Sequence, residues 1–348
     1  MDKVAIEINH YKNKEVLSMV SKNQKHFILF ILLWLFLPIT SHAQLSSWNQ
    51  TTVKSAFLKF IASVTSPSSK DFLKKEDRVA VFDFDGTIFA EYPIYSQVRY
   101  CYSRLNELSQ THKEIKSSAI YNTMTKESES SFAKSNHETL EKFWATCVSN
   151  QDTTTIYSSV LKWMEQTAHE LLNRKYSELY YLPMKEVIDY LHKKDFKVYI
   201  VSGSMSVFLR GYVKKALGIE PENVLSSETK TELITVNNRL EANLVPEFSL
   251  MNDKEQKALK IERTLGRRPV VAFGNSDGDV AMLTYTKFSD TAKGFAALVH
   301  HDDAKREFAY DVKSTVGALE KGLAEAKTRG WHVISMKNDW KTIFVNQK

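Results

Sequence analysis

Two acidic residues, Asp83 and Asp85, stand one residue apart directly after the apolar run Val79–Phe82, and Gly86 and Thr87 follow them. A short β-rich run bounded by charged residues and a glycine is typical of a buried parallel strand. Both acids are therefore expected at the carboxyl end of a strand inside the protein. Buried acids are unfavourable without a partner, so the pattern favours a functional site over an ordinary turn.

Two later β-rich runs also end in polar residues. The first ends in Ser202 and Gly203, and the second, Pro269–Gly274, is followed by Asn275 and Asp279. In an open parallel sheet, ligands bind beyond the carboxyl ends of the strands. If the three strands are neighbours, their polar ends are expected to meet at one site.

These residue types fit the transfer of a phosphoryl group. One carboxylate can attack phosphorus and form an acyl phosphate, which splits one difficult step into two. A second carboxylate can give a proton to the leaving oxygen and later take one from water. A hydroxyl and backbone N–H groups can hold the phosphoryl oxygens, and a lysine from the predicted helix 253–265 can balance their charge. Clustered carboxylates next to a phosphate need a divalent cation, and Mg²⁺ prefers such oxygen ligands.

Four short motifs resemble those of the haloacid dehalogenase-like (HAD) hydrolase superfamily. Their order and separations are similar to those of its phosphoserine-phosphatase-like branch, and the resemblance covers about residues 78–300. A single Asp-x-Asp pattern is weak, whereas four motifs at predicted strand ends and on the expected helix are specific. The motifs are Asp83-Phe84-Asp85-Gly86-Thr87, Val201-Ser202-Gly203, Lys257 with Ile261 four residues later, and Gly274-Asn275-Ser276-Asp277-Gly278-Asp279.

The resemblance implies a role for each matched residue. Asp83 is expected to be the nucleophile and a metal ligand. Asp85 is expected to be the general acid/base, with its backbone carbonyl as a metal ligand. Ser202, Gly203 and Lys257 are expected to bind the phosphoryl group. The dehalogenases and P-type ATPases of the superfamily lack an aspartate at the position of Asp85, so the resemblance points to a phosphatase.

Two features of the implied site stay open. Asn275 and Asp279 are expected to complete the metal site, but Asn275 stands where the family usually has an aspartate. Its amide oxygen can bind Mg²⁺ without supplying charge, so Asp277 or Asp279 could compensate, and another divalent metal is a second option. Lys254 and Lys260, on the same predicted helix as the family's lysine, are alternatives to it.

The order of the predicted elements indicates an α/β fold with a Rossmann-like parallel sheet, because strands alternate with helices from residue 183 onwards. We expect residues 78–90 plus 182–340 to form this core, after a helix and linker at 44–77. Residues 91–181 contain no glycine and carry apolar residues at helical spacing, so they are expected to form a helical cap inserted after the first core strand. In the superfamily, such a cap closes over the site and selects the substrate, and a cap of this size suggests a small phosphorylated metabolite rather than a phosphoprotein.

Three local features are also predicted. A β-hairpin over 232–245 is expected to turn at Asn237-Asn238. A helix is expected over residues 313–328. The segment His300–Asp303 could suggest a metal site, but its ligands are not spaced along one element, so we expect a surface loop.

The amino-terminal leader predicts export. An apolar run of about a dozen residues follows Lys25 and ends near small residues before Ala43. A membrane span needs roughly 20 residues, so a signal peptide over 1–43 is favoured over an uncleaved anchor. The protein is thus expected to be periplasmic or secreted, with no stable membrane span after cleavage. Translation could start at Met1 or at Met19, which gives a leader of usual length.

The bulk composition is that of a globular protein. The chain has 348 residues, 43% hydrophobic and 25% charged, and a net charge of +6 without a basic block, so no nucleic-acid partner is expected. Its two cysteines, Cys101 and Cys147, could form a disulfide in an oxidising compartment or remain buried thiols. The oligomeric state is not indicated.

The sequence therefore predicts an exported, Mg²⁺-dependent phosphatase that hydrolyses small phosphorylated metabolites through an aspartyl-phosphate. A phosphotransferase that passes the same intermediate to an alcohol is one alternative. A non-catalytic protein that binds phosphate esters is another, supported only by Asn275.

Overall fold

The structure is a computed structural model that describes residues 44–287 and 294–346. The predicted signal peptide, 1–43, lies outside these residues. Contacts within the chain separate Met1–Gln44 from a second unit, Leu45–Lys348, and the description below concerns that second unit.

Among the described residues, an eight-stranded, mostly parallel sheet forms the centre, in the order β4-β3-β2-β1-β5-β6-β7, with β8 paired to β6. Strand β1 lies between β2 and β5 and is parallel to both, so the three strands that end in the predicted site residues are neighbours. Together with the helices this confirms the predicted α/β, Rossmann-like fold. The strands are β1 (Val79–Phe82), β2 (Lys197–Met205), β3 (Val224–Val236), β4 (Arg239–Leu250), β5 (Val271–Gly274), β6 (Phe295–Asp302), β7 (Ala309–Tyr310) and β8 (His332–Ser335).

Helices follow or precede the core strands as the alternating pattern predicts. Helix α12 carries Lys257 and Ile261 four residues apart, and both are buried on the face that meets the sheet. It ends at Gly266, whose left-handed conformation (φ 58°) closes the helix. These helices are α2 (Thr52–Thr65), α9 (Leu182–Lys193), α10 (Ser206–Arg210), α11 (Val213–Leu217), α12 (Glu255–Leu265), α13 (Val280–Lys287), α14 (Lys321–Arg329) and α15 (Met336–Asp339).

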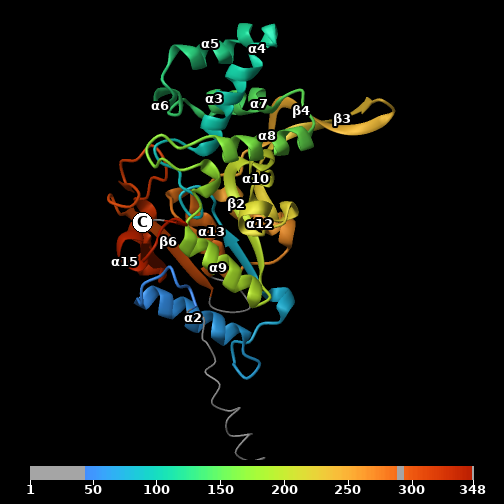
Figure 1. Cartoon of the computed structure of the whole chain (residues 1–348). Helices are drawn as coiled ribbons and strands as arrows, with labels where there is room; N and C mark the ends of the chain where they lie inside the picture. Colours follow the sequence, from blue (N-terminus) through green and yellow to red (C-terminus); the bar gives the residue numbers. More distant parts are fainter. Residues whose placement is uncertain (1–43, 288–293, 347–348) are drawn as a thin grey trace, which may run out of the picture. The chain divides into compact units, whose positions relative to one another are not determined.

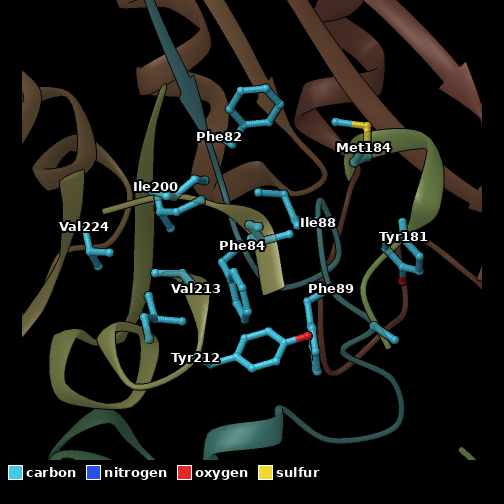
Figure 2. Close-up of a cluster of buried hydrophobic side chains, with 14 of the residues drawn as sticks. Phe82, Phe84, Ile88, Phe89, Tyr181, Met184, Ile200, Tyr212, Val213 and Val224 are labelled. Carbon is cyan, nitrogen blue, oxygen red and sulfur yellow. The ribbon is translucent and has the colours of Figure 1, made fainter. Parts of the chain in front are cut away.

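The loop after β1 is anchored by Phe84, the residue between the two site aspartates. Its ring stacks on Phe89, with centroids 5.2 Å apart, and meets the edge of Tyr212 (Figure 2). Because successive side chains of an extended chain point to opposite sides, burial of Phe84 turns Asp83 and Asp85 together towards the other side. The apolar core thus orients both acids.

Between β1 and α9 lies a group of six helices with no strand among them. A disulfide joins Cys101 and Cys147, whose Cα atoms are 5.3 Å apart, and so ties α3 to α7. This resolves the two options that the sequence leaves open. The helices are α3 (Ser96–Leu108), α4 (Lys113–Ser117), α5 (Ala119–Lys126), α6 (Glu129–Phe132), α7 (His137–Val148) and α8 (Thr153–Gln166).

The β3–β4 hairpin is longer than predicted and packs beside these helices (Figure 1). Its turn is at Asn237-Asn238 as predicted, with φ values of 50° and 60°, the conformation that two-residue hairpin turns require. The backbone of Leu244 in β4 accepts a hydrogen bond from Asn150 and donates one to Gln151, next to α7 and α8. The hairpin therefore supports the inserted helices.

Two local predictions are wrong. The segment His300–Asp303 is not a surface loop, since β6 continues through Asp302 and His301 is buried against the backbone carbonyl of Gly86, 2.7 Å from its Nε2. The helix predicted over 313–328 begins only at Lys321.

The late start of α14 has a tertiary cause. The carboxylate of Asp277 accepts hydrogen bonds from the backbone N–H groups of Glu320, Lys321 and Gly322. The first N–H groups of a helix have no hydrogen-bond partner within the helix. Here the side chain of Asp277, more than 40 positions earlier in the sequence, caps them. Asp277 therefore fixes the start of the helix.

No helix within residues 44–287 and 294–346 has the length and apolar character needed to cross a bilayer.

Reduction of the disulfide is expected to lower the free energy of unfolding by about 4 kcal/mol. The two cysteines are 46 positions apart, so the bond closes a long loop in the unfolded chain and lowers its entropy. The measurement is urea unfolding of the protein with and without dithiothreitol. The Cys101→Ala/Cys147→Ala variant is the control and should not respond to the reductant. Equal unfolding midpoints for oxidised and fully reduced protein would contradict the expectation.

Candidate active site

The ends of β1 and β2 and the start of α12 meet at a cavity of about 190 Å³. The predicted residues Asp83, Asp85, Ser202, Gly203 and Lys257 all line it. They come from segments far apart in the chain, and the strand register places them together. The inserted helices and the hairpin region add Tyr95, Gln97, Leu140, Trp144 and Met251 to the lining.

Lys257 connects two acids at the centre of the site. Its Nζ lies 2.7 Å from Asp83 Oδ1 and 2.7 Å from Asp279 Oδ1, and all three side chains are at least nine-tenths buried. Burial alone lowers the pKa of Lys257, but the two carboxylates outweigh this and raise it above its usual value. Lys254 and Lys260, the alternatives on this helix, do not line the cavity. Lys257 is therefore the lysine of the site.

Asp83 lies against the end of β5, where its backbone N–H donates to the carbonyl of Phe273. Burial first, and then the negative charge of Asp279, raise the pKa of Asp83 well above its usual value, while Lys257 opposes the shift. One lysine is thus insufficient to offset the cluster of carboxylates. An additional positive charge would stabilise Asp83 in the ionised form that a nucleophile needs.

Asp85 has one satisfied and one free oxygen. Its Oδ2 accepts a hydrogen bond from Ser204 Oγ at 2.6 Å, whereas Oδ1 is buried without a hydrogen-bond partner. Burial raises the pKa of Asp85 to about 6, against the bond from Ser204, which lowers it. A carboxyl group with such a pKa can both donate and accept a proton near neutral pH. Ser204, two residues after the predicted serine, lines the cavity and was not among the residues predicted from the sequence.

The phosphate-binding candidates Ser202 and Gly203 lie near the end of β2, where its pairing with β3 becomes irregular. Ser202 Oγ accepts from the backbone N–H of Ser204, at 3.0 Å. The buried Asn252 donates its side-chain amide to the carbonyl of Ser202 at 3.2 Å, and Ser227 Oγ donates to the carbonyl of Gly203 at 2.7 Å. These bonds fix the end of β2 with the Ser202 side chain at the cavity.

Asn275 and Asp279 are buried beside the cavity but do not line it. Both oxygens of Asp279 are engaged, Oδ1 by Lys257 and Oδ2 by the backbone N–H groups of Asn275 and Ser276. This geometry favours a role in positioning Lys257 over the predicted role as a metal ligand. Asp277, the other acid weighed there, is occupied with capping α14.

The side-chain amide of Asn275 is hydrogen-bonded at both ends to neighbouring side chains and does not face the cavity. Its Oδ1 accepts from Thr87 Oγ1 at 3.0 Å, and its Nδ2 donates to Glu91 Oε1 at 2.8 Å. Glu91 is only 2% exposed and lines the cavity with Asp83 and Asp85. Burial, followed by the charge of Asp85, raises the pKa of Glu91 well above its usual value.

Glu91 is the main residue that sequence analysis missed. It stands in the segment Ile88–Tyr92, which has no spacing pattern, and its one signal is a lone acid among apolar residues. A lone acid of this kind is usually a solvated loop residue, so the pattern alone did not indicate the site.

The residues present fit a divalent cation. Four carboxylates line the cavity, those of Asp83, Asp85, Glu91 and Asp253, while Lys257 is the one basic side chain among the described residues that line it. Asp85 Oδ1 is buried there without a hydrogen-bond partner. Within the described part of the chain, no three His, Cys, Asp or Glu side chains form a ready metal cluster. Mg²⁺ commonly binds through one or two carboxylates and keeps several waters, so these two observations agree.

Comparison with known proteins gives the class. The sequence matches the haloacid dehalogenase-like hydrolase family over residues 80–284, more than half of the chain, and the protein belongs to this family. No curated protein matches the sequence.

Similar solved structures include two of unknown function. One is from Bordetella pertussis Tohama I, with 13% identity and a TM-score of 0.47, covering 74% of this chain and 97% of that one. The other is from Anaerococcus prevotii DSM 20548, with 14% identity and a TM-score of 0.48, covering 74% and 87%. A probable phosphoserine phosphatase from Vibrio cholerae has 15% identity and a TM-score of 0.34, covering 66% and 58%.

Replacement of Asp279 by alanine is expected to lower the free energy of unfolding by about 3–5 kcal/mol, because it removes one partner of a buried ion pair. Asp189→Asn is the control, since it breaks a partly exposed pair with Lys185 and should change stability by about 1 kcal/mol or less. Equilibrium urea unfolding measures both. Equal losses for the two variants would show that the Lys257 pair does not stabilise the fold.

Proposed function

We propose that this protein is a divalent-metal-dependent phosphatase that hydrolyses small phosphate monoesters through an aspartyl-phosphate on Asp83. The observation that carries the proposal is the bridging of Asp83 and Asp279 by Lys257, at 2.7 Å each, in a cavity that Asp85 and Ser202 also line. This set supplies a nucleophile, a balancing cation, a proton donor and a phosphoryl-binding hydroxyl in one place.

The first half of the reaction uses Asp83 and Asp85. A carboxylate oxygen of Asp83 forms a bond to phosphorus, and the bond from phosphorus to the ester oxygen breaks. Asp85 gives its proton to the departing oxygen, which leaves as an alcohol. Ser202 and Lys257 stabilise the charge that accumulates on the phosphoryl oxygens.

The second half releases phosphate. Asp85, now ionised, takes a proton from water while the water oxygen bonds to phosphorus. The bond between phosphorus and Asp83 breaks, which restores the carboxylate. Ser204 holds Asp85 in place through both halves, because its hydroxyl donates to Oδ2 and leaves Oδ1 free for proton transfer.

A bound divalent cation would offset the repulsion between the carboxylates and the phosphate ester. The Asp83 carboxylate and the backbone carbonyl of Asp85 are the groups that would hold it. The charges at the cavity support this requirement, since Lys257 is already shared between two acids.

The cavity also suggests a class of substrate. Beyond the reacting end it is lined by Tyr95, Gln97, Leu140, Trp144 and Met251, none of which is basic. The indole N–H of Trp144 is buried without a hydrogen-bond partner, so it can donate to an acceptor on the ligand. We therefore propose an alcohol portion that is small and carries no anionic group.

Export to the periplasm or the medium is part of the proposal. The leader is the primary reason, and the disulfide between Cys101 and Cys147 supports it, because such bonds persist mainly in oxidising compartments. An exported phosphatase would release phosphate or alcohols from esters that do not cross a membrane.

The test is phosphate release by purified residues 44–348 from a panel of small esters, with Mg²⁺ and with chelator. Wild-type protein should release phosphate only with metal, and Asp83→Asn should reduce kcat by roughly a thousandfold or more. Phosphoethanolamine and O-phosphoserine form a matched pair that differs by one carboxylate, and the first should have the higher kcat/KM.

Three results would contradict the proposal in different ways. Activity that persists in Asp83→Asn would exclude the aspartyl-phosphate. Substrate turnover that exceeds phosphate release in the presence of glycerol would indicate a phosphotransferase. Folded wild-type protein that releases no phosphate from any ester would favour the non-catalytic binding protein.

Ser204→Ala is expected to shift the pH profile. The Ser204 hydroxyl stabilises ionised Asp85, so its loss raises the pKa of Asp85 above the present value of about 6. Since Asp85 must be protonated to act as an acid, the limb where kcat/KM falls with rising pH should move to higher pH. Ser226→Ala is the control, because Ser226 is a buried serine without a side-chain hydrogen bond. Identical limbs in wild type and Ser204→Ala would contradict the assignment of Asp85.

A further inference from the structure

We propose that Glu91 supplies the carboxylate that residue 275 lacks, and that it is a ligand of the divalent cation. The inference rests on the proposed function, since it concerns the metal of that same site. In the family's pattern this metal ligand stands at the end of β5. In this protein we place it in the loop that follows β1.

Asn275 is unsuited to be the ligand because both ends of its amide are engaged. Thr87 donates to its oxygen at 3.0 Å, and its nitrogen donates to Glu91 Oε1 at 2.8 Å. Turning the amide over would place its oxygen against the oxygen of Glu91, so the hydrogen bonds fix the orientation shown. The atom that points towards Glu91 is thus a nitrogen, which cannot bind a hard cation.

Glu91 has the features of a built ligand. One oxygen, Oε1, is held by Asn275 and by the hydroxyl of Tyr310, at 2.8 and 2.9 Å. Its other oxygen, Oε2, makes no hydrogen bond within residues 44–287 and 294–346, although the side chain is 2% exposed. A metal-ligating carboxylate commonly has this arrangement, with one oxygen fixed by neighbours and the other available.

Two glycines enclose this carboxylate. A Cβ atom on Gly86 would lie 2.3 Å from Glu91 Oε1, and one on Gly317 would lie 1.9 Å from it. Both glycines have positive φ, 73° and 55°, which other residues adopt only with strain. The backbone therefore makes room for the Glu91 carboxylate from two sides.

Charge balance points the same way. Glu91 lines the cavity with Asp83 and Asp85 and has no ion-pair partner among the described residues. Lys257, the basic residue of the cavity, is held by Asp83 and Asp279. A buried carboxylate in such a position is unfavourable unless a cation joins it. The competing explanation is that Glu91 has a structural role only, as hydrogen-bond acceptor for Asn275 and Tyr310. In that case a neutral glutamine at this position would preserve metal binding.

The experiment measures binding of Mn²⁺ to purified residues 44–348 by electron paramagnetic resonance, without substrate. Glu91→Gln keeps the shape of the side chain and removes its charge, and it should weaken Mn²⁺ binding by about tenfold or more. The double variant Glu91→Gln/Asn275→Asp returns a carboxylate to β5 and should recover affinity to within a few-fold of wild type. Tyr310→Phe removes one hydrogen bond to Glu91 but no charge, so it should bind Mn²⁺ nearly as well as wild type.

Each other outcome overturns the inference. Equal affinity of wild type and Glu91→Gln would show that Glu91 has a structural role only. If Glu91→Gln fails to fold by circular dichroism, the double variant decides, and a folded double variant with weak binding would count against a ligand role. Wild-type protein that binds no Mn²⁺ would remove the metal itself from the proposed function, whereas phosphate release that depends on Asp83 would still stand.

Discussion

The ion pairs that join Lys257 to Asp83 and Asp279 are the interaction on which the rest of the site depends. They connect β1, α12 and the turn after β5, which are separated by more than 170 residues in sequence at their extremes. Removing one partner of such a buried ion pair strongly destabilises the fold, because the remaining charge is then buried without a partner or water. The fold therefore needs these three residues together, and the same arrangement places a nucleophile beside a positive charge.

The apolar core complements this constraint. Phe84 is fully buried between the two aspartates and packs on Phe89 and Tyr212. Core packing thus determines the direction of Asp83 and Asp85, while polar contacts determine their protonation. Neither acid could be moved by one position without sending an aromatic ring into the cavity and a charge into the core.

The parts that could be predicted from sequence were those with a local signal. Short apolar runs ending in acids or in Ser-Gly indicated the strand ends, and Lys257 with Ile261 indicated one face of a helix. Contacts between distant segments left no such signal. Asp277 caps the start of α14, and the hairpin is hydrogen-bonded through Leu244 to the segment at Asn150. The polar residues around His301 suggest a loop by sequence, because their partners come together only in the folded protein.

Asn275 illustrates how a departure from a family pattern should be judged. By sequence it weakens the metal site and leaves room for a protein that only binds. In the structure its amide is bonded to a carboxylate that the pattern does not contain, Glu91. A cation responds to the charge and oxygen atoms within its reach and not to their position in the chain. A missing aspartate at a strand end is therefore compatible with a metal site when an acid from a neighbouring loop lines the same cavity.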